Sequence, residues 1–374
     1  MAGLGADGGD PVDVTLVCDI MMSFDSSIRP ALYLAEALVA RGHSVSMMSP
    51  TMSEDVEHHL RSIAITPRNL HTALVTRKLG LSMSWLEAWA WEAVLHLNSM
   101  HARPDAALVL NFSQMVAVPS CTWYLQGPPS LALRDIQREL PPDFRLAYTL
   151  VKPLLEYCDE RLVQRMKAVS RGIVANSKFC ATLYAQLGVT AQAVIHPPLD
   201  CYTFRPATAK PAADFVLTYV GKEIKISIIK RIADRGVKIK AFGSKTPFIR
   251  KDLMGHPNIE FLGRVTTSKL LEAYSNALFI LFPFTHEPFG YVPLEGMACG
   301  TPVLTENRQG PREYVTDGVT GWLMPSDEAL IHKAMELWEE GYPTQLRRNC
   351  IEAASKFDVR HYLEKWWTIL ATRL

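Results

Sequence analysis

The sequence predicts an α/β protein made of two doubly wound domains, each with a parallel sheet between layers of helices. Two observations carry this prediction. Short apolar, β-branched runs alternate with helical patterns along most of the 374 residues. A proline-rich stretch without periodicity, 197–211, divides this alternation into two halves. The length suits two domains that each bury a core of their own.

The first half opens with a β-loop-α-β unit, the building block of a parallel sheet. The run 12–19 is apolar and β-branched and predicts a strand, and 30–41 predicts a helix that starts with Pro30 and is stopped by Gly42. Further strands are predicted at 45–48, 106–111, 120–126, 172–176 and 193–196, with a helix at 179–187.

The second half repeats the alternation. Strands are predicted at 214–220, 237–242, 259–262, 278–283 and 302–305, and helices at 270–275 and 289–299. We expect residues 1–10 to be a disordered leader, 11–203 and 204–356 to be two Rossmann-like domains, and 357–374 to be a helix that crosses back onto the first domain. Ligands of such sheets bind beyond the carboxyl ends of the strands, so both halves could present those ends to one cleft.

Composition excludes several classes of protein. Lys and Arg number 39 and Asp and Glu 38, a net charge of +1 that does not favour nucleic-acid binding. The seven cysteines are scattered without a C-x-x-C pair, which argues against a disulfide framework or a zinc ribbon and favours a reducing, cytoplasmic location. The leader lacks the features of a signal peptide, and no apolar run is long enough for a membrane span.

Two segments leave a peripheral membrane contact open. The stretch 81–100 predicts a helix on which Trp85 and Trp89 share a face. Core or domain packing is the plain interpretation of this helix, and an interfacial helix touching lipid is the sharper alternative. The segment 134–171 mixes basic and acidic residues, which favours a solvated helical face over contact with an anionic membrane.

The most informative segment is 282–295. Glu287 follows a predicted strand, and Glu295 lies eight residues later in the next helix, roughly 80° around its axis. The backbone N–H groups of Phe289 and Gly290 lie near the start of that helix, where its dipole favours an anion. A diphosphate flanked by two carboxylates that grip hydroxyl groups suits this arrangement. The plain alternative is that Glu287 caps the helix and Glu295 is a surface acid.

The segment 282–325 resembles the donor-binding region of glycosyltransferase family 4, which has the GT-B fold. Glu287 and Glu295 match its E-x7-E element. Two further motifs lie in the same region: residues 296–304, which together with Glu295 are similar to E-[AG]-[MA]-A-x-G-x-P-V, and 317–321, which match D-G-x-x-G. The resemblance extends to most of the chain through motifs at 174–179 (A-N-S-x-F), 194–200 (V-I-x-P-P-V-D) and 41–45.

The resemblance implies roles for these residues. Glu287 would contact hydroxyl groups of the donor sugar, and Glu295 would bind the nucleotide ribose. Phe289 and Gly290 would offer backbone N–H groups to the sugar and the diphosphate. Pro288 and Tyr291 flank them and would line the same donor site.

A basic pair near the start of the second domain completes the donor site in this family. The matching strand here ends Gly221-Lys222, and Lys225 follows at short spacing. Lys222 stands where Arg is common and would bind phosphate as a point charge. Solvated surface charge is the plain alternative for both lysines.

The first domain departs from the family pattern at two loops. The family often places a His near the donor sugar, and Gln126 is the nearest equivalent of that His in this sequence. A glutamine can hydrogen-bond a sugar hydroxyl but cannot carry a proton. The loop after the first strand lacks the usual Gly-Gly, and Ser26 and Ser27 would take its place by hydroxyl and backbone donation. No D-x-D metal element stands in a suggestive place, so we expect no metal and no cofactor.

The resemblance therefore implies a retaining hexosyltransferase that moves a sugar from a nucleotide sugar to a hydroxyl of a glycan, lipid or small molecule. Glu287, Lys222 and Gln126 would be its catalytic residues. The alternative is a non-catalytic GT-B-fold protein that serves as a scaffold for a partner, as the altered Lys222 region and the missing His suggest. An NAD-linked dehydrogenase is disfavoured, because no G-x-G-x-x-G follows Asp19.

Overall fold

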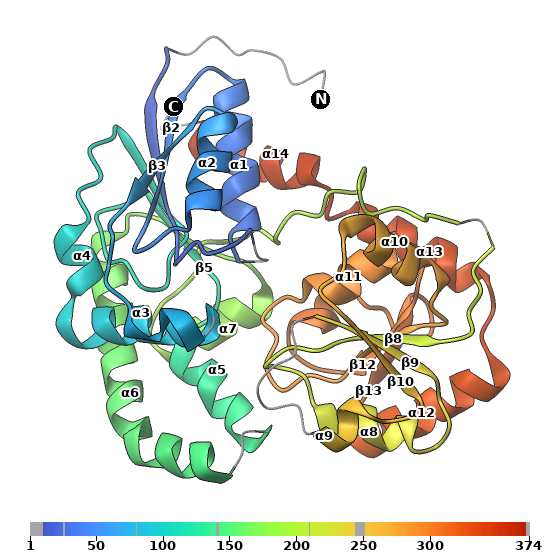
Figure 1. Cartoon of the computed structure of the whole chain (residues 1–374). Coiled ribbons are helices and arrows are strands. Elements are labelled where there is room, and N and C mark those ends of the chain that lie inside the picture. Colours follow the sequence, from blue (N-terminus) through green and yellow to red (C-terminus); the bar gives the residue numbers. More distant parts are fainter. Residues whose placement is uncertain are drawn as a thin grey trace. The chain divides into compact units, whose positions relative to one another are not determined.

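The computed structural model describes residues 10–24, 27–79, 81–139, 142–208, 210–243 and 251–371. They form two compact units (Figure 1). The first comprises Met1–Leu131, Leu150–Pro198 and Arg360–Leu374, and the second comprises Ala132–Thr149 and Leu199–Val359. The second unit thus begins slightly before the boundary that the sequence suggested at 203/204, and it also takes in a segment from the part assigned to the first domain.

The described part of the first unit contains a parallel sheet of seven strands in the order β3-β2-β1-β4-β5-β6-β7. The strands are β1 Asp13–Val17, β2 Ser44–Ser49, β3 Ile65–Asn69, β4 Leu108–Asn111, β5 Thr122–Leu125, β6 Ile173–Ala175 and β7 Ala193–Val194. The inner strands β4 and β5 are buried along their whole length, which is why they are continuous apolar runs in the sequence. The strand order reverses between β1 and β4, the switch point of a doubly wound sheet.

The helices of the first unit follow from local signals. Pro30 lies in the first turn of α1, and Gly42 follows its last turn with a φ of 89°. The helices are α1 Arg29–Ala40, α2 Glu54–Ser62, α3 Leu81–Leu95, α4 Leu97–His101, α7 Lys178–Gln186 and α14 Val359–Leu370, with the 3₁₀ turn η1 Val75–Leu79. Two helices include residues of both units, α5 Pro129–Ile136 and α6 Pro142–Val169, and η2 Gln137–Glu139 lies between them.

The last helix, α14, belongs to the first unit although the chain reaches it from the second (Figure 1). Its Trp366 is fully buried and packs its ring against Tyr124 of β5 and against Phe112, which directly follows β4. The Tyr362 hydroxyl donates to the backbone oxygen of Pro30, 2.6 Å away. These contacts fasten the end of the chain to the start of α1.

The second unit repeats the design with six strands among its described residues, in the order β10-β9-β8-β11-β12-β13 and all parallel. The strands are β8 Val216–Tyr219, β9 Ile239–Phe242, β10 Ile259–Gly263, β11 Ile280–Phe282, β12 Val303–Glu306 and β13 Gly321–Met324. Here the order reverses between β8 and β11, so the carboxyl ends of these two strands define the second switch point.

Helices cover both faces of this second sheet. In Figure 1, α10, α11 and α13 lie on one face and α8 and α12 on the other. The bounds are α8 Ile226–Ala233, α9 Lys251–Met254, α10 Thr267–Asn276, α11 Tyr291–Ala298, α12 Asp327–Glu340 and α13 Gln345–Ser355, with the 3₁₀ turn η3 Gly310–Glu313. The two parallel-sheet α/β domains confirm the fold class that the sequence predicts.

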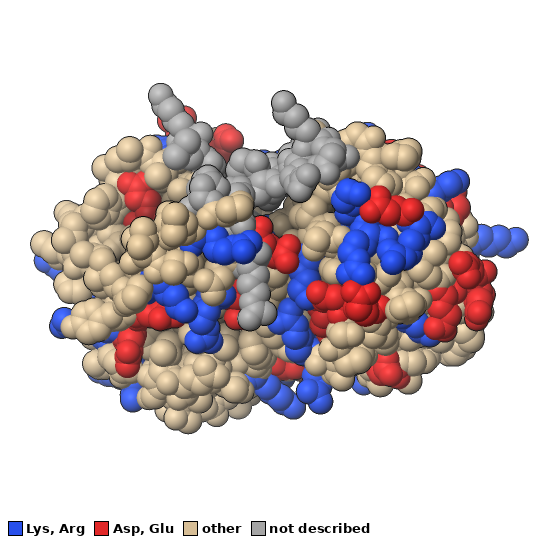
Figure 2. Space-filling model, turned by 90° about the horizontal axis from the view of Figure 1, so that it is seen from below, with Lys and Arg blue, Asp and Glu red and all other residues tan. Residues whose placement is uncertain are grey.

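On the surface shown in Figure 2, basic and acidic side chains are interspersed.

Candidate functional site

The switch point of the second sheet brings together two of the loops that the sequence singled out. Residues 221–225 follow β8, and residues 283–290 follow β11. The two loops are joined by backbone hydrogen bonds from Lys225 N to Pro283 O (2.8 Å) and from Thr285 N to Glu223 O (2.7 Å). The Thr285 hydroxyl donates to the same Glu223 oxygen at 2.9 Å. The loops therefore form one ledge at the carboxyl ends of the strands.

Glu287 closes this ledge at the start of α11. Its Oε1 accepts a hydrogen bond from the backbone N of Phe289 at 3.3 Å, and its own backbone N donates to Gln309 Oε1 at 2.6 Å. Gly290 precedes the helix with a φ of 90°, and a Cβ there would lie 2.8 Å from the Tyr314 hydroxyl oxygen. A side chain at 290 would therefore be both strained and obstructed. Glu287 thus bonds within the turn before α11, whose N-cap is Gly290 without a side-chain capping bond, so the plain alternative of a helix cap is not what the geometry shows.

The charge on Glu287 depends on its neighbours. Burial and the nearby Glu223 carboxylate raise the pKa of Glu287 to about 8. The N–H groups of Phe289 and Gly290 and the ammonium of Lys222 act in the opposite direction on this pKa. Glu287 and Lys222, which the sequence selected separately, are therefore close enough to influence each other. Glu223 is a third member of this group that sequence reasoning passed over.

Glu295 occupies the buried face of α11. Only 3% of it is exposed, and its Oε2 accepts a hydrogen bond from the Tyr274 hydroxyl at 2.9 Å. The next residue, Gly296, lets the helix approach β11, because a Cβ there would lie 2.5 Å from Ile280 Cγ1. Glu295 is therefore not the surface acid of the plain alternative. A carboxylate can accept several hydrogen bonds, so the contact with Tyr274 is compatible with a further bond from a ligand hydroxyl.

The other donor-site residues predicted in the second unit also belong to the ledge. The Lys225 side chain, however, is directed to two carboxylates. Gly221 is pressed against the Tyr219 ring, and Pro288 and Tyr291 are partly exposed beside Glu287 and Gly290. Lys225 directs its ammonium to Glu306 Oε1 at 2.9 Å and to Asp327 Oδ1 at 2.6 Å.

The first unit holds the other predicted residues. Gln126 follows β5 and is half-buried, with its Nε2 donating to the backbone oxygen of Phe112 at 2.7 Å. Ser27 is half-buried in the turn before α1, and Ser26 lies outside the described residues. The ledge of the second unit and these residues belong to different units, so their roles in one site stay predictions.

Asp19 is the residue of the first unit that the sequence did not reveal as important. It lies two residues after the end of β1, near the switch point, and is almost fully buried. Its Oδ1 accepts from the Ser113 hydroxyl and from the backbone N of Gln114, each at 2.7 Å, and its Oδ2 accepts from Trp85 Nε1 at 3.1 Å. A carboxylate at the end of the predicted strand 12–19, which is otherwise mostly apolar, was the available signal. Ser113 and Gln114 lie in the loop after β4 and Trp85 lies on α3, so Asp19 braces that loop and joins it to α3.

The tryptophan-rich segment is two helices, α3 and α4, because His96 between them has a left-handed φ of 59°. Trp89 is fully buried and donates to Asp159 Oδ1 at 3.2 Å, while Trp91 is 36% exposed. Packing within the unit therefore accounts for Trp85 and Trp89. None of the helices in the described ranges is long and apolar enough to cross a bilayer.

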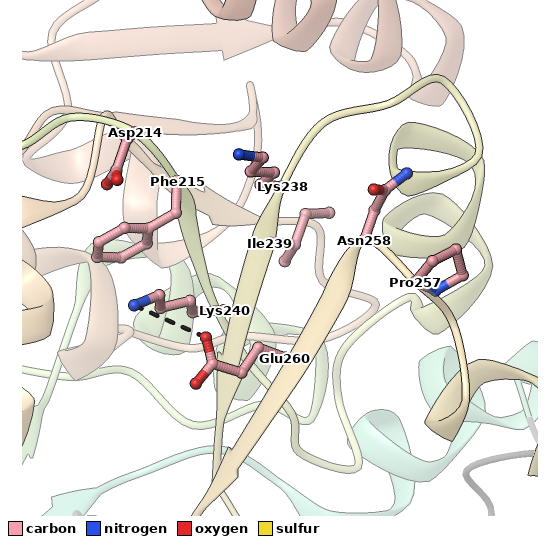
Figure 3. Close-up of a pocket in the computed structure, with 8 residues that line it drawn as sticks. All are labelled: Asp214, Phe215, Lys238, Ile239, Lys240, Pro257, Asn258 and Glu260. Carbon is pink, nitrogen blue, oxygen red and sulfur yellow. Dashed lines mark ion pairs between the residues drawn. The ribbon is translucent and has the colours of Figure 1, made fainter.

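A pocket of about 220 Å³ lies elsewhere in the second unit, at the amino ends of β8, β9 and β10 (Figure 3). Lys240 and Glu260 point toward each other beside the Phe215 ring, with an ammonium-to-carboxylate distance of 3.7 Å. Because it lies at the opposite ends of the strands, this pocket is not part of the ledge. Within the described residues, no group of three or more His, Cys, Asp or Glu side chains is placed to hold a metal ion.

Known proteins resemble this chain in sequence and in fold. Residues 248–357 match the family model for Glycosyl transferases group 1. The D-inositol 3-phosphate glycosyltransferase of Mycobacterium sp. (strain KMS) is 28% identical over 191 residues, which cover 44% of this chain and 43% of that protein. The chain spans less than half the length of the curated relatives it matches.

Two solved structures share the architecture of the whole chain. HepE of Anabaena, in complex with UDP or UDP-glucose, has a TM-score of 0.68 at 15% identity and covers 96% of this chain and 100% of its own. Sucrose-phosphate synthase from Thermosynechococcus elongatus has a TM-score of 0.69 at 17% identity, covering 96% and 98%. At such identities the likeness concerns the fold, which is GT-B as the sequence predicts.

Proposed function

We propose that this protein is a retaining glycosyltransferase of family 4 that transfers a hexosyl group from a nucleotide sugar to an acceptor hydroxyl group. The observation that carries the proposal is the ledge at the second switch point, where Glu287, Lys222 and the start of α11 come together beside the buried Glu295. The match of residues 248–357 to Glycosyl transferases group 1 supports it, as do the UDP and UDP-glucose bound by HepE.

Each residue of the ledge has a task in this proposal. The Lys222 ammonium attracts the donor diphosphate. The turn before α11 offers it the N–H groups of Phe289 and Gly290, which otherwise bond to Glu287. Glu287 then turns to hydroxyl groups of the donor sugar. Glu295, whose Oε2 already accepts from the Tyr274 hydroxyl, accepts a hydrogen bond from the ribose.

The reaction needs no nucleophile from the protein. The acceptor oxygen forms its bond to the anomeric carbon on the face from which the diphosphate leaves, the bond from that carbon to the diphosphate oxygen breaks, and the acceptor proton passes to the departing phosphate. The protein contributes position and electrostatic stabilisation of the leaving group. We propose that no divalent metal takes part, so full activity is expected in excess chelator. Activity lost to chelator and restored by Mn²⁺ would contradict this.

Thermal unfolding against a panel of UDP-, GDP- and ADP-sugars tests the donor site. A ligand at 100 times its Kd adds about 2.7 kcal/mol to the free energy of unfolding. We expect one nucleotide class to stabilise the wild type and the control Glu272→Gln, whose side chain is exposed on α10. Glu295→Gln should lose most of this stabilisation, because it removes a charged acceptor while keeping the shape and the Tyr274 contact.

The outcomes separate the proposed enzyme from the non-catalytic scaffold. Stabilisation by every class, or by none, would argue against a specific donor site and favour the scaffold. For a donor that binds, the anomeric configuration of the product by NMR decides between retention and inversion. We also propose a reducing, cytoplasmic compartment, supported by the seven free cysteines.

A further inference from the structure

The two lysines after β8 face different partners. Lys222 is exposed, and its positive charge acts on Glu287. Lys225 has a side chain that is only 15% exposed, and its ammonium lies between the carboxylates of Glu306 and Asp327 at 2.9 and 2.6 Å. The sequence assigns both lysines to the diphosphate. Their surroundings differ too much for one shared task.

Glu306 connects Lys225 to the loop that leads to Glu287. It ends β12 with 4% exposure, and its Oε2 accepts a hydrogen bond from the backbone N of Phe284 at 3.1 Å. The backbone N of Lys225 donates to Pro283 O in the same loop at 2.8 Å. Lys225 and Glu306 therefore hold the loops after β8 and β11 from two sides, while Asp327 links them to the start of α12.

A phosphate group would bind unfavourably at Lys225. It would approach the carboxylates of Glu306 and Asp327 and would meet repulsion from both. Glu306 is buried, so losing its ammonium partner to a ligand would leave a desolvated charge uncompensated. Arg308 is a second cation near Glu306, at 4.0 Å, but it also donates to the backbone oxygens of Phe284 and Thr285.

We infer that Lys225 is a positioning residue that neutralises Glu306 and sets the two loops of the ledge, and that Lys222 is the lysine that contacts the donor diphosphate. This inference rests on the proposed function and assigns the lysines within it. It makes a specific demand: Lys225 is needed only while Glu306 is charged. A glutamine at 306 can still accept the hydrogen bond from Phe284 N, so it keeps the loop in place without needing an ammonium partner.

A cycle of variants tests this demand with UDP, GDP and ADP as probes, followed by titration calorimetry and thermal unfolding. With the nucleotide that binds the wild type, Lys225→Met should weaken binding at least tenfold and lower the Tm. Lys225→Met/Glu306→Gln should recover an affinity within about threefold of Glu306→Gln alone. Lys222→Met should weaken binding at least tenfold with an unchanged Tm. Adding Glu306→Gln should not restore its affinity.

Four results would overturn the inference. A double variant that binds as weakly as Lys225→Met would make Lys225 a direct phosphate ligand. Rescue of Lys222→Met by Glu306→Gln would remove the distinction between the lysines, as would unchanged affinity in Lys222→Met. A wild type that binds none of the three nucleotides would refute the proposed function itself, and the assignment with it, whereas the other results leave the nucleotide site standing.

Discussion

Raising the pH should destabilise the second unit through Glu287, and Glu287→Gln should remove the effect. In the folded protein, burial and the Glu223 carboxylate raise the pKa of Glu287 to about 8, against an ordinary value of 4.5. The folded protein therefore keeps a proton on Glu287 between these two values, while the unfolded chain has released it. Because the folded state binds more protons in this window, the free energy of unfolding falls as the pH rises through it.

The two pKa values set the size of the effect. Their difference, at 1.36 kcal/mol for each pH unit, corresponds to at most about 5 kcal/mol. Glu287 is half-buried rather than fully buried, and solvent screening reduces this figure to roughly 2–4 kcal/mol. The stabilisation is complete below about pH 4.5 and is lost once the pH exceeds about 8. Glutamine has no proton to release and should show no such loss.

Urea unfolding followed by tryptophan fluorescence, from pH 5 to pH 9, measures the effect. We expect Glu287→Gln to equal the wild type near pH 5 and to exceed it in free energy of unfolding at pH 9. Glu272→Gln, on the exposed face of α10, serves as the matched control and should follow the wild type at every pH. If the free energies of unfolding of the wild type and Glu287→Gln differ by the same amount at every pH in this range, the raised pKa assigned to Glu287 is wrong.

Three further changes test the packing by the same unfolding measurement. Arg165→Met should cost about 3 kcal/mol, because it strips the fully buried Glu92 carboxylate of the guanidinium 2.8 Å away, and a loss below 1 kcal/mol would contradict this. Gly296→Ala should cost about 1–3 kcal/mol by pushing α11 away from β11. The control Gly255→Ala, with open space around its Cβ, should change the free energy of unfolding by no more than about 0.5 kcal/mol. Equal effects of the two variants would count against the close approach of α11 to β11. Trp366→Ala should cost about 3–5 kcal/mol, and a neutral result would show that α14 does not contribute to the core.

The sequence predicted the inner strands and the edge strands β7 and β10, but it missed the edge strands β3 and β13. Inner strands such as β4 are buried on both faces and therefore read as apolar runs. β3 lies at the edge of its sheet and reads Ile-Thr-Pro-Arg-Asn, a polar pattern that suits an exposed edge and carries no strand signal. β13 begins with Gly321, which the motif presented as part of a turn. A Cβ there would lie 2.2 Å from the backbone oxygen of Val303, so this glycine serves close strand pairing.

The candidate site shows a similar division between local and distant information. The placement of Glu287 and Gly290 at the start of α11 follows from neighbouring residues and was predictable. The partner of Lys225 was not, because Asp327 is 102 residues away in the chain and only the sheet topology brings it near. Charge type and spacing alone therefore made the two lysines look equivalent. Only their surroundings distinguish them.

Around the ledge, Lys222 and Lys225 meet three carboxyl groups, those of Glu223, Glu287 and Glu306, and this excess bears on how a diphosphate could bind. The charge of Lys225 is neutralised by its ion pair with Glu306. Lys222 is then the lysine that acts on the pair Glu223 and Glu287. If both of these carboxyls were charged, a diphosphate would meet net repulsion. The raised pKa of Glu287 removes one negative charge at neutral pH and turns that carboxyl into a hydrogen-bond donor. A single lysine can then suffice, because a proton on Glu287 does part of the work that a second basic residue would otherwise do.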